Sequence, residues 1–147
     1  MLHIGVDEAG RGPVIGPLVV GCVCVPEEDI KLLVEAGVKD SKDLTKKKRE
    51  TIRTWFFENC QTRGWKYSVI TCQPARIDSA VANKGLNILE TQLFAEAINK
   101  LSLTGGNNGF MITNDACDVD EQRFTRRISA LVDQWPWPCL LYTSDAA

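Results

Sequence analysis

These 147 residues contain few histidines, no CxxC pair and no long apolar run. Each of these features excludes a class of site or of location. There is one histidine, His3, and the six cysteines contain no CxxC pair, so neither zinc binding nor histidine-based catalysis is indicated. The longest apolar stretch, Val14 to Pro26, is broken by glycine and proline and is shorter than the roughly 20 residues of a membrane-spanning helix. No signal-peptide pattern precedes the first predicted strand. We therefore expect a cytoplasmic protein with no membrane partner and with buried, reduced thiols.

An excess of charge of one sign is also missing. Seventeen Lys and Arg against nineteen Asp and Glu give a net charge of −2, which excludes a basic field over the whole molecule. The basic residues concentrate between Lys39 and Arg53, where seven basic and three acidic residues leave +4 and the rest of the chain carries −6. This polarity is typical of a duplex-binding flank on an acidic protein. A solvated helix face is the alternative.

What is present is the composition of an ordinary globular domain, with 44% hydrophobic and 24% charged residues. Leu2 to Val6 alternates as a half-buried strand does, turn residues follow at 9–13, and an apolar run over about 14–25 completes a predicted hairpin. Further along, the patterns predict helices over 26–36, 45–60, 74–82, 86–101 and 120–131, and strands over 65–71 and 110–112. Strands that alternate with helices favour a single α/β domain with a mixed sheet.

Acidic side chains follow two of the predicted strands. Asp7 and Glu8 end the first strand, and Asp115 follows the short strand near residue 112. Ligands of open α/β sheets bind outside the carboxyl ends of the strands, so these carboxylates are candidates for one site. An all-oxygen set suits Mg²⁺ or Mn²⁺ better than zinc. The alternative is that these acids only cap turns and helices.

A longer motif surrounds the first acidic pair. Residues 5–19 read GVDEAGRGPVIGPLV, and this run closely resembles the signature of ribonuclease HII, the type 2 ribonuclease H family. Residues 40–50 (DSKDLTKKKRE) resemble the family's second block. Residues 86–90 (LNILE), 114–119 (NDACDV) and 123–124 (RF) are closer to the archaeal and eukaryotic branch than to the bacterial one.

The resemblance implies a ribonuclease H-like mixed sheet flanked by helices, and it implies roles for particular residues. The implied catalytic metal ligands, for Mn²⁺ or Mg²⁺, are Asp7, Glu8 and Asp115. The turn Gly10-Arg11-Gly12 would sense the ribonucleotide, because glycines let the backbone approach the 2′-hydroxyl closely. Ser41 and Lys42 would contact substrate phosphates.

The implied activity is two-metal-ion hydrolysis of the RNA strand of RNA–DNA hybrids and of ribonucleotides embedded in duplex DNA. It leaves a 3′-hydroxyl and a 5′-phosphate. A nucleic-acid-binding remnant without turnover remains a second hypothesis. Another carboxylate-metal nuclease of similar fold is a third, against which the Gly-Arg-Gly turn argues. Other notable residues have structural interpretations: His3 and the tryptophans Trp55 and Trp65 are expected to be packing residues, and Asp118, Asp120 and Glu121 begin a helix.

The last part of the chain departs from the family's pattern. The family's fourth carboxylate, an aspartate in a later block, has no counterpart here. Residues 139–147 (CLLYTSDAA) resemble translated sequencing adapter. We therefore expect a catalytic domain over residues 1–138 that is incomplete at its C-terminus, followed by a non-native tail over 139–147. Asp145 stands in no recognisable motif and is not predicted to be a ligand.

Overall fold

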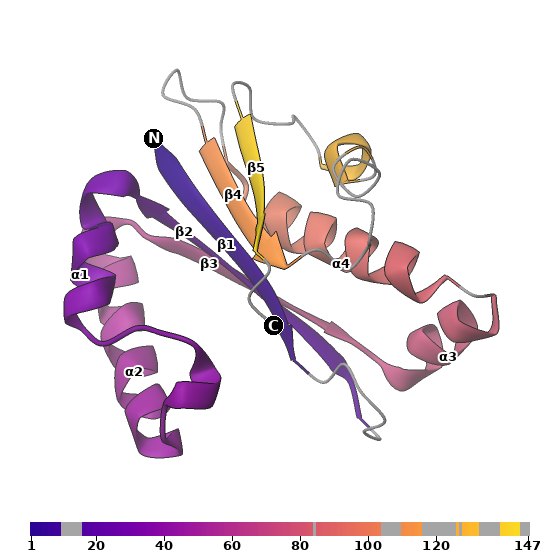
Figure 1. Cartoon of the computed structure of the whole chain (residues 1–147), viewed down its shortest axis with the longest axis horizontal. Helices are drawn as coiled ribbons and strands as arrows, with labels where there is room; N and C mark the ends of the chain where they lie inside the picture. Colours follow the sequence, from indigo (N-terminus) through magenta and orange to yellow (C-terminus); the bar gives the residue numbers. More distant parts are fainter. Residues whose placement is uncertain are drawn as a thin grey trace.

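A computed structural model describes residues 1–9, 16–83, 85–103, 110–115, 126, 128–132 and 139–144. Within them, the backbone forms one five-stranded sheet (Figure 1). Its strands are β1 (Leu2–Ala9), β2 (Leu18–Pro26), β3 (Lys66–Cys72), β4 (Phe110–Asp115) and β5 (Cys139–Ser144). They are arranged in the order β3-β2-β1-β4-β5. The β1–β2 and β2–β3 pairs are antiparallel, whereas β1–β4 and β4–β5 are parallel. The predicted hairpin and mixed sheet are confirmed.

The predicted helices are confirmed with small shifts of their ends. They are α1 (Ile30–Glu35), α2 (Lys46–Arg63), α3 (Pro74–Ala82) and α4 (Leu86–Lys100), with the short 3-10 turns η1 (Glu27–Asp29) and η2 (Ser41–Asp43). Thr45 caps α2, since its hydroxyl accepts the backbone N–H of Lys48 at 3.1 Å. Gly64, at φ 72°, ends α2 in the left-handed conformation that glycine adopts without strain. The helix predicted over 120–131 is described only at 126 and 128–131, where it is helical.

Strand β5 was not predicted. Its residues belong to the segment that the sequence pattern assigns to a tail, yet the strand pairs with β4 from Phe110↔Cys139 to Asp115↔Ser144. The run Leu140-Leu141-Tyr142-Thr143 is rich in residues that suit a pleated sheet. The structure describes only the backbone of β5. That residues 1–138 form the catalytic domain and 139–147 a tail stays a prediction.

The main core lies between the sheet and α4. Alternate residues of β1 and β2, among them Ile4 and Val20, pack with Leu93 and Phe94 of α4. The other side of the sheet carries α1 and α2 (Figure 1), which join it through an aromatic cluster around Trp65, only 3% exposed. Within the described part of the chain, no helix is long and apolar enough to cross a membrane.

Candidate active site

The parallel pairing of β1 and β4 brings two of the predicted ligands to the same level of the sheet. The last pair of that ladder is Val6↔Asn114, and Asp7 and Asp115 are the next residues of the two strands. Neighbouring strands lie about 4.8 Å apart. Strand alternation puts both residues on the face opposite α4, because Val6 belongs to the buried row that packs on that helix. The backbone therefore sets Asp7 and Asp115 side by side.

Glu8 occupies the other row of β1. It continues the series of Ile4 and Val6, is half-buried and pairs with Val20 of β2. Strand alternation thus directs Asp7 and Glu8 to opposite sides of the sheet at the position where β1 ends. Two sequence-adjacent acids are separated by the pleat, whereas two acids more than a hundred residues apart in sequence share a face. The separation of Asp7 from Glu8 follows from strand alternation, whereas the register that sets Asp7 level with Asp115 comes only from the pairing of β1 with β4.

Asp7 is exposed, and its carboxylate is held by the neighbouring backbone. The Glu8 N–H donates to Asp7 Oδ1 at 2.8 Å. The residue opposite Asp7 in β2 is Gly21, and a Cβ built there would meet no atom within 4 Å. Within the described residues, the side of Asp7 that faces β2 is therefore free of side chains at this position. The sequence pattern did not select Gly21 as a site residue, although an isolated glycine within a strand signals a close approach.

The donor set fits a hard divalent cation in its chemistry. Asp7 and Asp115 offer carboxylate oxygens from adjacent strands, which are the ligands that Mg²⁺ and Mn²⁺ take. Among the side chains that the structure describes, no three His, Cys, Asp or Glu residues form a metal-binding group. The side chain of Asp115 is not among those described. Two features thus support a metal site here: the carboxylate chemistry of Asp7 and Asp115, and the register of β1 with β4.

The predicted phosphate contacts lie on a short turn between α1 and α2. Ser41 and Lys42 begin η2, and both are exposed. The Asp40 carboxylate caps the turn by accepting the Lys42 backbone N–H at 3.0 Å. This bond fixes the backbone while the Lys42 ammonium stays in solvent. The predicted ribose sensor, Gly10-Arg11-Gly12, lies outside the described residues.

Of the two tryptophans predicted to be packing residues, Trp65 is buried and Trp55 is only half-buried. Trp65 is buried, and its ring lies 5.5 Å from that of Trp55, centroid to centroid. His3 is half-buried, with Nε2 3.8 Å from Glu27 Oε1. Asp118, Asp120 and Glu121 lie outside the described residues.

The described thiols fit the expectation of reduced cysteines. Cys22, Cys24 and Cys72 are buried, and Cys60 is half-buried; all four are free. Burial raises the pKa of Cys22 to about 12, with a further contribution from Cys24, and burial raises that of Cys24 to about 11. Such thiols stay protonated at neutral pH and act neither as nucleophiles nor as metal ligands. Cys117 and the side chain of Cys139 lie outside the described part.

Comparisons with known proteins agree with these features. The family model described as Ribonuclease HII matches residues 4–133. A curated ribonuclease HII from Thermococcus onnurineus is 41% identical over 129 residues, which are 88% of this chain and 52% of that protein. The crystal structure of the ribonuclease H2 from Pyrococcus horikoshii superposes with a TM-score of 0.76 at 34% identity, over 98% of this chain and 63% of that one. The chain spans about half the length of the curated relatives it matches.

A more distant solved structure shares the fold alone. It is the Bst ribonuclease HIII in complex with Mn²⁺, at 20% identity and a TM-score of 0.68, over all of this chain and 46% of that one.

Proposed function

Since the chain belongs to the ribonuclease HII family, we propose that it is the catalytic part of a metal-dependent endoribonuclease. Its substrates are RNA–DNA hybrids and DNA duplexes with embedded ribonucleotides. The observation that carries this proposal is the β1–β4 register, which sets Asp7 and Asp115 at one level on one face of the sheet. Two carboxylates brought close together repel each other, and a cation bound between them would remove that repulsion.

In this proposal Asp7 and Asp115 hold Mn²⁺ or Mg²⁺ from one face of the sheet. Glu8, which lies in the other row of β1 one residue before the strand ends, would complete the ligand set around the end of the strand. The bound ions would activate the attacking water and stabilise the leaving oxygen. The chain's own contribution is to fix the ligands. The N–H of Glu8 orients the Asp7 carboxylate through the 2.8 Å hydrogen bond to Oδ1, and Oδ2 would be the oxygen offered to the ion. The bare flank at Gly21 leaves room beside that oxygen.

Substrate binding is proposed for two further groups of residues. Gly10-Arg11-Gly12 would meet the ribose 2′-hydroxyl, with Arg11 able to hold a phosphate in a fork. Ser41 and Lys42 would bind phosphates of the duplex, and support for this comes from their exposure on a capped turn. Because only the backbone of Lys42 is held by the hydrogen bond that caps this turn, its side-chain ammonium can move to meet a phosphate.

The test uses this chain to about Gln134, continued with the remaining segment of a relative such as the Thermococcus onnurineus protein. We expect this chimera to cut a duplex with one ribonucleotide in the presence of Mn²⁺ or Mg²⁺, and to spare the all-DNA duplex, because a site built to pair with a 2′-hydroxyl rejects a substrate that lacks it. Asp7→Asn should abolish cutting. Lys42→Ala should raise KM, whereas Lys31→Ala, an exposed lysine on α1, should not.

Two outcomes would redirect the proposal. Equal cutting of both duplexes would favour another carboxylate-metal nuclease of similar fold. Binding of the hybrid without cutting by the chimera, with Asp7 intact, would favour a nucleic-acid-binding role. The 147-residue chain on its own is the comparison, and we expect its cutting to be several powers of ten slower, since each lost factor of ten costs about 1.4 kcal/mol of transition-state stabilisation.

A further inference from the structure

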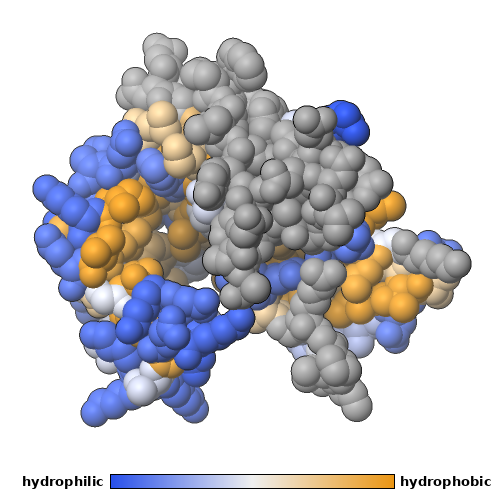
Figure 2. Space-filling model, viewed as in Figure 1, coloured by the Kyte–Doolittle hydropathy of each residue, from blue (hydrophilic) through white to orange (hydrophobic). Residues whose placement is uncertain are grey.

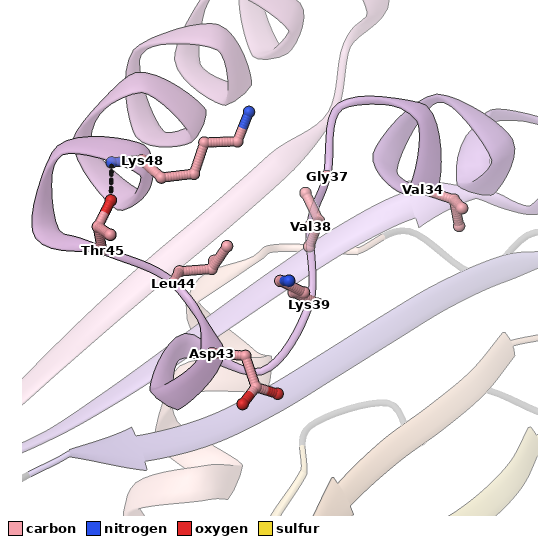
Figure 3. Close-up of a pocket in the computed structure, with 8 residues that line it drawn as sticks. All are labelled: Val34, Gly37, Val38, Lys39, Asp43, Leu44, Thr45 and Lys48. Carbon is pink, nitrogen blue, oxygen red and sulfur yellow. Dashed lines mark hydrogen bonds between the residues drawn. The ribbon is translucent and has the colours of Figure 1, made fainter.

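A groove runs between α1, η2 and α2 on the side of the sheet that carries these elements. Two hollows of about 430 and 290 Å³ make it up. They share the lining residues Val38, Lys39 and Leu44 and are therefore adjacent. Figure 3 shows the first hollow, with Val34 from α1, Val38 and Lys39 from the connecting loop, and Lys48 from α2 around it. The second hollow extends it down to Val23 of β2.

The floor of this groove is apolar and poorly covered. Its apolar lining residues are Val23, Leu33, Val34, Val38, Leu44, Ile52 and Phe56. Neither α1 nor α2 contains a single buried residue, and Val34 is 70% exposed. Figure 2 shows this as orange surface bordered by blue, around a hollow at the left of the molecule. Helices normally bury one apolar face. Phe56 of α2 packs on Trp65, whereas Val34 of α1 stays largely exposed, so this face is only partly covered.

The rim of the groove is basic. Lys39, Lys48, Arg49 and Arg53 line it, and Asp43 is the one acid among the described lining residues. The other lysines of this segment, Lys42, Lys46 and Lys47, do not line either hollow. The basic cluster of the sequence is therefore divided into residues that line the groove and residues that do not.

We propose that this groove docks an amphipathic helical segment of a partner protein, with apolar side chains on the floor and acidic side chains on the rim. Charge complementarity favours an acidic partner over a neutral or basic one. The apolar floor favours a peptide over nucleic acid, because phosphates do not cover Leu33, Val34 and Val38. Helices that lie in apolar grooves contribute anchors at positions i, i+3, i+4 and i+7. This docking is independent of the nuclease activity proposed above.

The test measures binding of labelled synthetic peptides to the full 147-residue chain by fluorescence anisotropy. The first peptide has about four turns of helix, with leucines at the anchor positions and glutamates beside them. In the second peptide lysines replace the glutamates, and in the third serines replace the leucines. We expect only the first of the three peptides to bind with a micromolar Kd. Each of the other two should bind at least about tenfold more weakly, a loss of about 1.4 kcal/mol.

Two double variants provide the matched comparison on the same helix. Arg49→Glu with Arg53→Glu should weaken binding of the glutamate peptide at least about tenfold and should strengthen binding of the lysine peptide. Lys46→Glu with Lys47→Glu makes the same change of charge outside the groove and should alter neither affinity by more than about twofold. The gain in lysine-peptide binding requires a folded groove, so loss of folding cannot imitate it.

Several results would overturn the proposal. They are no binding of the glutamate peptide, an equal loss in the Lys46 and Lys47 variant, or full binding of the serine peptide. Two results together would identify a general surface for polyanions instead. They are displacement of the glutamate peptide by an RNA–DNA hybrid, and an affinity of the serine peptide equal to that of the glutamate peptide with leucines. If the chimera with a relative's remaining segment no longer binds the glutamate peptide, the groove is covered by the protein's own chain and has no partner.

Discussion

Asp7 lies directly opposite Gly21 in the antiparallel ladder of β1 and β2. Residues opposite each other in such a ladder project to the same face, with Cβ atoms about 5 Å apart. Any side chain introduced at position 21 would therefore stand beside the Asp7 carboxylate. In the part of the chain that the structure describes, a Cβ at position 21 meets no atom within 4 Å, so that space is free.

This arrangement predicts opposite outcomes for two substitutions at one position. Gly21→Ala should leave folding and metal binding unchanged, because the added methyl group has room. Gly21→Lys should fold but lose affinity for Mn²⁺, since its ammonium can pair with Asp7 in place of the cation. The measurement is the increase in melting temperature on addition of Mn²⁺. Equal increases in both variants would contradict a metal site at Asp7.

Metal binding by the unsubstituted chain should raise its melting temperature. A ligand that binds only the folded state stabilises it by about 2.7 kcal/mol at a hundred times its Kd. We expect Asp115→Asn to abolish the increase with Mg²⁺ or Mn²⁺. Asp78→Asn, an exposed acid on α3, is the control and should retain it. A folded protein that is not stabilised by either ion would refute the predicted ligand set.

The hydrogen bond from Trp65 Nε1 to Asp29 Oδ2, 2.8 Å long, ties the start of β3 to η1. Arg63 lies 3.8 Å from the same carboxylate. Trp65→Phe keeps an aromatic ring but removes the donor, and should lower the free energy of unfolding by about 1–3 kcal/mol. Trp55→Phe, which alters the ring packed on Trp65, should cost less because Trp55 is only half-buried. Urea denaturation measures the free energy of unfolding of both variants. Equal decreases would show that the volume of the ring matters and the hydrogen bond does not.

The buried thiols predict a loss of stability in alkali. Burial raises the pKa of Cys22 from 9.0 to about 12 in the folded state. Below pH 9 the thiol is protonated in both states and has no effect on the pH dependence. Above pH 9 the unfolded thiol ionises while the folded one does not, so stability falls as pH rises towards 12. The free energy of unfolding of Cys22→Ala should fall less steeply between pH 8 and pH 10 than that of the unsubstituted chain. Parallel curves would contradict the shift.

The face of the sheet around Asp7 also exposes apolar side chains, including Tyr67 and Val69 of β3. Contiguous apolar surface of this kind promotes association. We expect the 147-residue chain to aggregate, and Val69→Lys to reduce aggregation measured by light scattering. Val81→Lys, at an exposed position on α3, should help less because Val81 lies outside this face. Equal benefit from both would point to net charge as the cause.

The sequence alone was sufficient for most local structure and for the family. The cap at Thr45, the stop at Gly64 and the period of α4 depend on neighbouring residues, and such short-range preferences can be recognised in a linear pattern. The motif in residues 5–19 identified the family for the same reason, since its glycines and acids are contiguous. The ligand roles of Asp7, Glu8 and Asp115 and the substrate roles of Ser41 and Lys42 stay predictions.

Only the tertiary structure decided which residues share a surface. The register of β1 with β4 sets Asp7 beside Asp115, whereas strand alternation by itself puts Glu8 in the other row. The pairing of β5 with β4 and the division of the basic cluster into residues that line the groove and residues that do not were, like that register, not predictable from spacing. The physical reason is that strand register and helix docking depend on burial summed over distant segments. A one-residue shift in β4 would have sent Asp115 to the opposite face without any change in local sequence preference.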